Sequence, residues 1–439
     1  MLKLARFIWL KTMNSEQKII GVRESCRVCG FSPLLPIFSL GDQFITDFPE
    51  MGSSDEKTPK FPLELVLCNK KDGGCGLLQL KHTPSHEAMY RQYWYRSGVS
   101  NTMTNELRGI ARKVESLMDL NGGDYVLDIG SNDSTLLRGY STPNLQLVGF
   151  EPARNLMKYA RGGVAKIIND FFSHELWNKE VGGAKAKSVT AIAMFYDLED
   201  PNKFVADVAR CLHDDGVFII QMNALPSMLA QNAFDNIGHE HLEYYSLLAL
   251  ENLLARHNLE VFDVELNNIN GGSFRTYIRH RGKGKNIKIS SGAVRRLDDL
   301  RKHEQSIGLD DKTAYEDFVK RIMGFRTRTV DFINNEIKKG KRVYIYGAST
   351  RGNALLQFYG LDHKHIIAAA ERNPDKWNKR IVGTKIPIIS EEQARKDKPD
   401  YFLVLPWAFL EEFTAREAEF LKSDGKFIVP LPEFKVISA

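Results

Sequence analysis

The chain has 439 residues, of which 43% are hydrophobic and 26% charged, and its formal net charge is +5 at pH 7. Such a length and composition predict two or three globular domains, and the small net charge gives no support for nucleic-acid binding. Because no apolar run reaches the roughly 18 residues that a bilayer-spanning helix needs, we do not expect a membrane protein. We expect a cytoplasmic protein, monomeric or homodimeric, and a local anionic ligand remains compatible with its charge.

Residues 1–20 are predicted to be an N-terminal extension. They include the apolar and basic stretch MLKLARFIWLKTM, which no convincing small-residue cleavage site follows. A secretory signal peptide is therefore not predicted, and Met13 is a possible alternative start.

Four of the five cysteines lie within the first 75 residues. Cys26 and Cys29 form a C-x-x-C knuckle, and the stretch LCNKKDGGCGLL adds Cys68 and Cys75 after a glycine-containing turn. Four thiolates of this kind are typical of a tetrahedral zinc site with no open coordination position, which serves folding. Reduced thiols without a metal, or a disulfide pair, are the alternatives. Residues 21–95 are thus predicted to form a zinc-binding domain.

Residues 96–283 alternate strand-like apolar runs with helical segments, which predicts a doubly wound α/β sheet. The runs are YVLDIG, LQLVGFEP, AKIIND, SVTAIAMF and GVFIIQMN. The stretch LEVFDVELNNINGGSFRTYIRH then gives two further strands joined by an Asn/Gly turn. We expect this antiparallel hairpin to close one edge of the sheet.

The turn after the first strand indicates the cofactor. It reads DIGSNDSTLL, without the G-x-G-x-x-G of a dinucleotide site, and an acidic residue ends the second strand 21 residues after Gly130. This pattern places a nucleoside ribose over the carboxyl edge of the sheet and favours S-adenosylmethionine. The expected contacts are Asp128, Gly130 and Asn132 around its methionine part, Glu151 on its ribose, Asp170 and Phe171 beside its adenine, and Met194 and Phe195 after the fourth strand.

His239, Glu240 and His241 lie in a loop directly before a leucine-rich helix, for which Ser246 is a suitable N-cap. The spacing does not match the H-E-x-x-H of a metalloprotease, whose histidines lie one turn apart on a helix. The three residues are either part of an active site or structural residues at a loop–helix junction.

Residues 284–439 are predicted to form a helical linker and a C-terminal Rossmann-like domain. A strand at residues 343–346 runs into the turn GASTRGN and then a helix, an arrangement that suits a phosphate group. No Walker lysine–serine pair is present, so nucleotide hydrolysis is not predicted. The domain either binds the phosphates of a nucleotide-linked substrate or only packs against the central domain.

Eight motifs in order resemble the nucleotide-sugar C-methyltransferases, which methylate C3 of dTDP-4-keto-deoxysugars. The resemblance covers nearly the whole chain, from Cys26 to Pro432. The motifs are the four cysteines with CGLLQL, then YWYRSGVS, DIGSND, HEHLEYYS, NGGSFRTYI, YGASTRGNALL, ERNPDKW and LPWAF. This resemblance implies a class I S-adenosylmethionine methyltransferase sheet flanked by a zinc-binding domain and a C-terminal Rossmann-like domain, with the sugar in the cleft between them.

The resemblance also implies residue roles. Glu240 and His241 match the family's acid/base pair, with His241 as the base and Glu240 fixing its tautomer or raising its basicity. Tyr95 matches an active-site tyrosine that stabilises the enolate, and His239 is a weaker candidate for the base. The expected substrate-binding residues lie in the same motifs: Tyr244, Tyr245, Gly272, Ser273, Arg275, Ser349, Arg351 and Asn353.

The chain departs from the family pattern at two places. Gly238 stands where a tyrosine commonly precedes H-E-H, and a family histidine after the fourth strand is replaced within MFYDLED. The side chains that could compensate are Tyr196, Asp197, Tyr244 and Tyr245. Two alternatives to carbon methylation are methylation at oxygen or nitrogen of a related glycosyl or small anionic substrate, and a non-catalytic binding protein.

Overall fold

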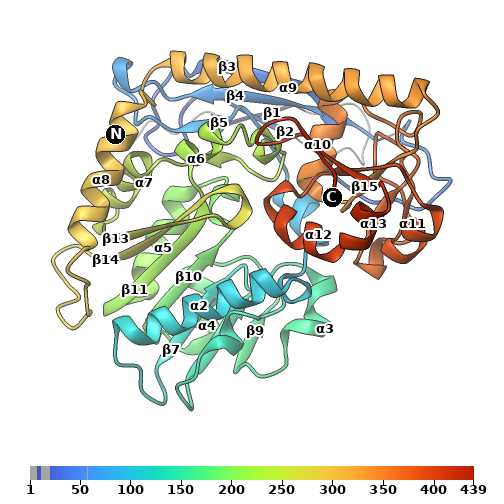
Figure 1. Ribbon diagram of the computed structural model, residues 1–439. Helices are drawn as coiled ribbons and strands as arrows, with labels where there is room; N and C mark the ends of the chain where they lie inside the picture. Colours follow the sequence, from blue (N-terminus) through green and yellow to red (C-terminus); the bar gives the residue numbers. More distant parts are fainter. Residues whose placement is uncertain (1–6, 11–19, 57) are drawn as a thin grey trace.

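The computed structural model describes residues 7–10, 20–56 and 58–439, which form an α/β fold around three principal sheets (Figure 1). The sheets follow one another along the chain, as the sequence predicts. Of the predicted extension, only residues 7–10 and residue 20 are described, and the rest lies outside the described residues. Within the described part, no helix is both long enough and apolar enough to cross a membrane.

The N-terminal part contains a four-stranded antiparallel sheet in the order β12-β5-β4-β3. Its last strand, β12, is contributed by the central domain and follows the H-E-H loop directly. A smaller sheet in the order β1-β2-β6 lies beside it. The strands are β1 (Phe7–Leu10), β2 (Ile20–Arg23), β3 (Leu35–Phe44), β4 (Lys60–Leu67), β5 (Leu78–Leu80), β6 (His82–Pro84) and β12 (Glu243–Tyr244).

The central sheet has seven strands in the order β13-β14-β11-β10-β7-β8-β9, and the five strands from β11 to β9 are parallel. Their apolar runs are buried because helices cover both faces of the sheet. The predicted hairpin is confirmed as β13 and β14, with β14 inserted next to β11. The strands are β7 (Tyr125–Ile129), β8 (Gln146–Phe150), β9 (Lys166–Ile168), β10 (Ala186–Ile192), β11 (Leu212–Asn223), β13 (Leu259–Asn267) and β14 (Ser273–His280).

The helices around this sheet have apolar faces at helical spacing. In α2, residues 103, 107, 110, 111, 114 and 117 are buried, and Ser100 caps its first turn. Helix α8 packs on β13, although its residues fall in the predicted linker. The domain boundary at residue 283 stays a prediction. The helices are α1 (His86–Tyr90), α2 (Asn101–Leu117), α3 (Met157–Ala160), α4 (His174–Val181), α5 (Pro201–Cys211), α6 (Leu225–Ala230), α7 (Leu247–Ala255) and α8 (Ala293–Ser306).

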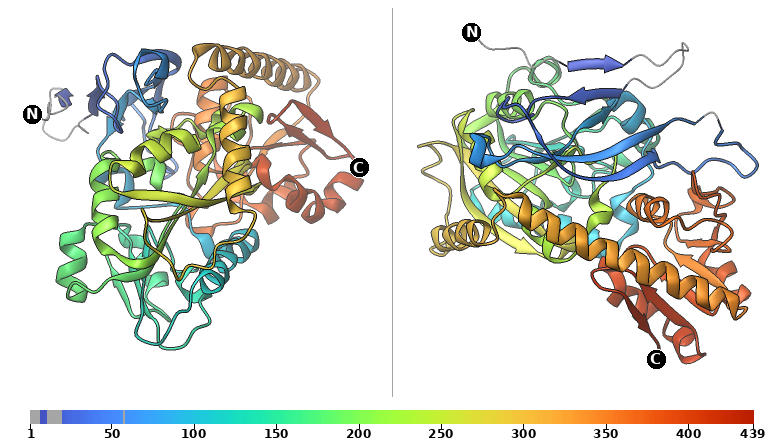
Figure 2. Two further views of the ribbon diagram at one scale, coloured as in Figure 1. Left: turned by 90° about the vertical axis from the view of Figure 1, so that its left-hand side faces the viewer. Right: turned by 90° about the horizontal axis from the view of Figure 1, so that it is seen from above.

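The C-terminal sheet has six strands in the order β17-β16-β15-β18-β19-β20, all parallel except β20. The long helix α9 lies in the predicted helical linker; it contacts β3 and runs from the central domain to the C-terminal domain (Figure 2). The elements are α9 (Lys312–Lys338), β15 (Val343–Tyr346), α10 (Thr350–Tyr359), β16 (Ala369–Glu371), β17 (Ile388–Ser390), α11 (Glu391–Asp397), β18 (Tyr401–Val404), α12 (Leu410–Arg416), α13 (Ala418–Lys422), β19 (Lys426–Val429) and β20 (Lys435–Ile437).

One hydrophobic core joins the N-terminal sheet, the C-terminal sheet and the loop that carries the H-E-H motif. Leu65 and Leu78 from the first sheet, Phe234 and Leu242 from the loop, and Ile345 from the last sheet belong to the same buried cluster. The loop is therefore held by the two flanking domains as well as by the central one.

Candidate active site

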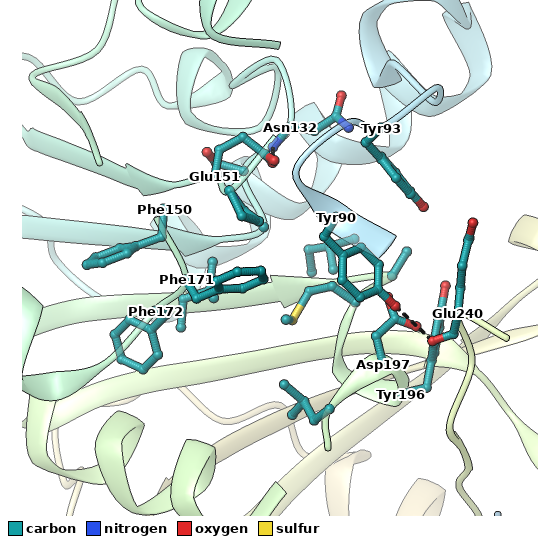
Figure 3. Close-up of a pocket in the computed structure, with 18 of the residues that line it drawn as sticks. Tyr90, Tyr93, Asn132, Phe150, Glu151, Phe171, Phe172, Tyr196, Asp197 and Glu240 are labelled. Carbon is teal, nitrogen blue, oxygen red and sulfur yellow. Dashed lines mark hydrogen bonds between the residues drawn. The ribbon is translucent and has the colours of Figure 1, made fainter. Parts of the chain in front are cut away.

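A cavity of about 490 Å³, here called the main cavity, lies at the carboxyl ends of β7, β8 and β10. Its walls come from all three parts of the chain: residues 86–97 of the N-terminal part, the strand-end loops of the central sheet, and Thr350 and Arg351 of the C-terminal domain. Figure 3 shows two ends. Phenylalanines and Glu151 form one end, and Tyr196, Asp197 and Glu240 form the other.

Glu151 fixes the glycine turn at the first end. Its carboxylate accepts hydrogen bonds from the backbone N–H groups of Asn132 (2.8 Å) and Ala153 (2.7 Å). Gly130 has a φ of 70°, and a Cβ there would come within 3.0 Å of Met194. Burial raises the pKa of Glu151 and of the neighbouring Asp128 to about 7 each. The hydrogen bonds that the two carboxylates accept lower these pKa values and partly offset the effect of burial.

Aromatic side chains surround the same end. Phe150, Phe171 and Phe172 line the cavity together with Met194 (Figure 3). Phe195, in contrast, is fully buried among Phe204, Phe218 and Tyr245 and does not line the cavity. This corrects the prediction for Phe195: the short 3-10 turn at Phe195–Asp197 directs it into the core.

This end fits S-adenosylmethionine. The cavity volume is typical of a small-molecule site, and a buried acid follows the second strand at the position that receives ribose hydroxyls. The cavity is lined by eight acidic side chains and two basic ones, which suits a cationic sulfonium. Seven of the eight expected cofactor residues line the cavity, and their individual contacts with the cofactor stay predictions: Asp128, Gly130, Asn132, Glu151, Asp170, Phe171 and Met194.

His241 lies at the other end of the cavity with a defined tautomer. Its Nδ1 is 2.6 Å from the backbone carbonyl of Asn236, and a carbonyl only accepts hydrogen bonds. Nδ1 therefore carries the hydrogen, and Nε2 keeps its lone pair in the neutral ring. Burial lowers the pKa of His241 to about 4, so the ring is neutral at pH 7. The ring of Tyr196 lies edge-on at 4.4 Å.

Glu240 lies beside His241 in a cluster of acidic and phenolic groups. Burial raises its pKa to about 7, and Lys376 partly opposes that shift. Burial and the charge of Glu240 raise the pKa of Asp197 well above its ordinary value. The Tyr90 hydroxyl donates to the backbone carbonyl of Glu240 at 2.9 Å (Figure 3). The expected orienting role of Glu240 is corrected here, because the Asn236 carbonyl holds His241 Nδ1.

His239 faces away from the main cavity. Its Nε2 is 3.1 Å from the carbonyl of Phe61, and its ring packs against the Phe61 ring. It belongs to the wall of a smaller cavity of about 20 Å³. Tyr95 lines the main cavity, as expected, and is 42% exposed. The structure thus separates the two histidines, and only His241 reaches the main cavity.

Seven of the eight expected substrate residues do not line this cavity. Arg275 is buried in an ion pair with Glu106 and donates to Gln221, within the sheet. Tyr245 is fully buried and donates to Glu243. The other five lie elsewhere. Tyr244 lines a separate small cavity, Gly272 and Ser273 bond the carbonyl of Ile269 in a turn, Ser349 caps α10, and Asn353 accepts from Gln357 within that helix.

Arg351 is the expected substrate residue that does line the cavity. Its guanidinium lies 2.8 Å from the carboxylate of Asp235 and donates to the carbonyl of Asn270 at 2.9 Å. Because Asp235 comes from the loop before H-E-H, this ion pair joins the C-terminal domain to the active-site loop.

The four N-terminal cysteines form one cluster. The sulfurs of Cys26, Cys29, Cys68 and Cys75 all lie within 4.8 Å of one another. Cys26 and Cys75 are 3.5 Å apart and Cys29 and Cys68 are 3.4 Å apart, far beyond the roughly 2.05 Å of a disulfide. Four sulfurs about 2.3 Å from one zinc lie about 3.8 Å apart in a tetrahedron. The cluster fits zinc, and the disulfide alternative is wrong.

Sequence reasoning missed several residues of this site. Tyr90 and Tyr93 line the cavity, and their spacing with Tyr95 in YRQYWY was an available signal. Phe150 and Phe172 also line the cavity, and they are the sequence neighbours of the expected residues Glu151 and Phe171. Asn236 contributes only its backbone carbonyl, which any residue could supply, so no sequence motif indicates its role.

Comparison with known proteins agrees with this geometry. The family profile described as "C-methyltransferase C-terminal domain" matches residues 268–432. The profile "Methyltransferase domain" matches residues 103–264, and "Putative zinc binding domain" matches residues 26–90. The C-methyltransferase NovU of Streptomyces niveus is 30% identical over 427 residues, which cover 96% of this chain and 99% of that protein.

Solved structures resemble a smaller part of the chain. An S-adenosylmethionine-dependent methyltransferase from Clostridium acetobutylicum is 14% identical, with a TM-score of 0.32, over 42% of this chain and 94% of its own. One from Leishmania major is 14% identical, with a TM-score of 0.32, over 42% of this chain and 75% of its own. The profile matches and the full-length relative identify the chain as a member of the C-methyltransferase family, an S-adenosylmethionine-dependent enzyme with a zinc-binding N-terminal domain.

Proposed function

We propose that the enzyme methylates the carbon α to the ketone of a nucleotide-linked keto-deoxysugar. The observation that carries this proposal is the neutral His241, whose Nε2 is free to accept a proton in the same cavity as the glycine turn and Glu151. An α-hydrogen is weakly acidic, so its removal needs a base and a group that stabilises the enolate. Both are available at this end of the cavity.

His241 removes the α-proton through Nε2. The Asn236 carbonyl holds Nδ1–H and keeps its hydrogen bond when the ring becomes positively charged. The low pKa of His241 guarantees the unprotonated form at neutral pH, but it also makes the ring a weak base. The enolate must therefore be stabilised strongly.

Tyrosine hydroxyls supply this stabilisation. Burial raises the pKa of Tyr93 and Tyr196 well above the ordinary value, so both hydroxyls stay protonated and can donate to the enolate oxygen. Tyr95 adds a third hydroxyl at the cavity wall. Glu240, with a pKa of about 7, is the second acid/base group. S-adenosylmethionine supplies the electrophilic methyl group when bound.

The charge of the cavity limits where a nucleotide can bind. Its two basic side chains are Lys203 and Arg351, and Arg351 is already paired with Asp235. An uncharged sugar suits this acidic cavity, whereas a diphosphate does not. We propose that the nucleotide lies outside the cavity, against the C-terminal domain, and that only the sugar enters.

Product analysis tests the proposal. The enzyme is incubated with methyl-labelled S-adenosylmethionine and a panel of nucleotide-linked ketosugars, with the free sugars as matched controls. We expect a methyl group on the carbon next to the ketone, seen by NMR, and much slower reaction of the free sugars. A methyl group on oxygen or nitrogen contradicts carbon methylation, and equal rates with the free sugars contradict the role of the nucleotide.

A further inference from the structure

Residues 86–98, here called the strap, run from the N-terminal domain across the carboxyl ends of β7, β8 and β9. His86, Tyr90, Tyr93, Tyr95 and Ser97 of the strap face the main cavity. The strap therefore forms one wall of the cavity, next to the glycine turn of the cofactor end. The loops after β7, β8 and β9 hold this wall in place through hydrogen bonds.

Asn155, in the loop after β8, binds the strap backbone twice. Its Oδ1 accepts from the N–H of Tyr93 at 3.0 Å, and its Nδ2 donates to the carbonyl of Tyr93 at 2.8 Å. The next contact lies one residue away, where Arg154 N–H donates to the Arg91 carbonyl at 3.1 Å. Asn155 does not line the cavity. Its side chain acts on the strap alone.

The loops after the two neighbouring strands bind the strap as well. After β7, Asn132 accepts from Ser97 N–H at 3.0 Å and donates to the Tyr95 carbonyl at 3.1 Å. After β9, Asp170 accepts from Arg91 at 3.1 Å, and the Arg91 guanidinium lies 4.8 Å over the ring of Phe171.

These contacts occupy polar groups at the strand ends where the cofactor is expected. The strap follows the zinc-binding domain directly, so these bonds tie the chain that leaves this domain to the strand ends of the methyltransferase sheet. Displacement of the strap would expose this side of the cavity to solvent. We propose that Asn155 and Arg91 are positioning residues that retain the cofactor by holding the strap. This inference concerns the cofactor alone and does not depend on the identity of the sugar.

The test combines binding and exchange measurements on the full-length, zinc-loaded protein. The affinity for S-adenosylhomocysteine is measured by calorimetry, and backbone amide exchange of residues 86–98 by mass spectrometry. For Asn155→Ala we expect roughly tenfold weaker binding and faster exchange in the strap, because two hydrogen bonds are lost. Asn252→Ala, which removes an exposed asparagine on α7, is the matched control and should change neither.

Zinc content and the melting temperature show whether the variant is folded. If Asn155→Ala does not fold, Arg91→Gln, which breaks the contact with Asp170, is measured in the same way. Wild-type affinity in the presence of faster strap exchange overturns the proposal, since the strap then does not retain the cofactor. Weaker binding with unchanged strap exchange overturns it too, because the effect then does not act through the strap.

Discussion

The central and C-terminal sheets each place a carboxylate clamp at the ends of two neighbouring strands, but different side chains cover the two turns. Glu151 follows the second strand of the central sheet and binds the N–H of Asn132 in the turn after the first strand. Glu371 is the last residue of β16 and accepts from the N–H of Ala348, in the turn after β15, at 3.1 Å. Each carboxylate also accepts from the backbone N–H two residues further on. The local structures are thus nearly identical.

The two turns differ in what covers them. The first opens to the cavity of about 490 Å³. Over the second, Arg351 pairs with Asp235, the Trp407 indole donates to the same carboxylate at 3.2 Å, and Lys376 donates to the Ala348 carbonyl at 2.8 Å. The active-site loop therefore uses the second turn as an anchor. A strand-end turn alone does not make a ligand site, since the neighbouring domain decides whether it stays open.

Loss of the zinc ion should have the largest effect on stability, because the zinc site lies next to the strand that holds the active-site loop. The loop continues into β12, which pairs with β5 directly after the cysteine cluster. Cys29→Ser should remove zinc and unfold the N-terminal sheet, because binding of a structural zinc ion contributes directly to folding. Metal analysis and thermal unfolding measure this loss. A variant that keeps its melting temperature without zinc contradicts the structural role, and Cys211→Ser, outside the cluster, is the control.

The next effect separates the two histidines. His241→Asn should lower the rate of methyl transfer by about 10²–10⁴, the typical contribution of a general base, and leave the affinity for S-adenosylmethionine nearly unchanged. His239→Asn should act mainly on stability, because this ring packs against Phe61 outside the main cavity. Steady-state rates and calorimetry distinguish the two. An equal loss of rate in both variants argues against a special role for His241.

The acids of the two turns, Glu151 and Glu371, should differ in their effect on the cofactor. Glu151→Ala should weaken S-adenosylmethionine binding roughly tenfold or more, because a charge-assisted acceptor for the ribose is lost. Glu371→Ala should leave that affinity unchanged and lower the melting temperature instead. Calorimetry on both variants measures the difference. If Glu371→Ala weakens cofactor binding as much as Glu151→Ala, the two turns are not separate in function.

The smallest expected effect is a pH dependence of cofactor affinity. The pKa of Glu151 is raised to about 7, so its carboxylate fraction rises from roughly one tenth at pH 6 to nine tenths at pH 8. If the carboxylate is the form that accepts the ribose hydroxyls, affinity should increase up to about ninefold over this range. Glu151→Gln should flatten the dependence. Tighter binding of the cofactor at pH 6 than at pH 8 would contradict the role of the Glu151 carboxylate.

Much of the fold was predictable because the apolar runs and the glycine turns are local signals. The strand alternation predicted the central sheet, and the spacing of Cys26, Cys29, Cys68 and Cys75 predicted a cluster that the structure brings within 4.8 Å. The leucine-rich helix also begins after Ser246, as expected.

The parts that sequence could not predict depend on distant contacts. Arg275 looked available for a substrate, but Glu106, far away in the sequence, pairs with it. The tautomer of His241 is set by the backbone carbonyl of Asn236, which any residue could supply. The strap crosses three strand ends through bonds between residues far apart in the sequence, and no local sequence pattern indicates such a crossing.

On the proposed mechanism, His241 removes a proton from the substrate carbon that is methylated. The most direct measurement is the exchange of that hydrogen in deuterated water, with S-adenosylhomocysteine in place of the methyl donor, followed by NMR. We predict that the wild-type enzyme exchanges the α-hydrogen of a nucleotide-linked ketosugar and that His241→Asn does not. Exchange at the wild-type rate in His241→Asn would contradict the account.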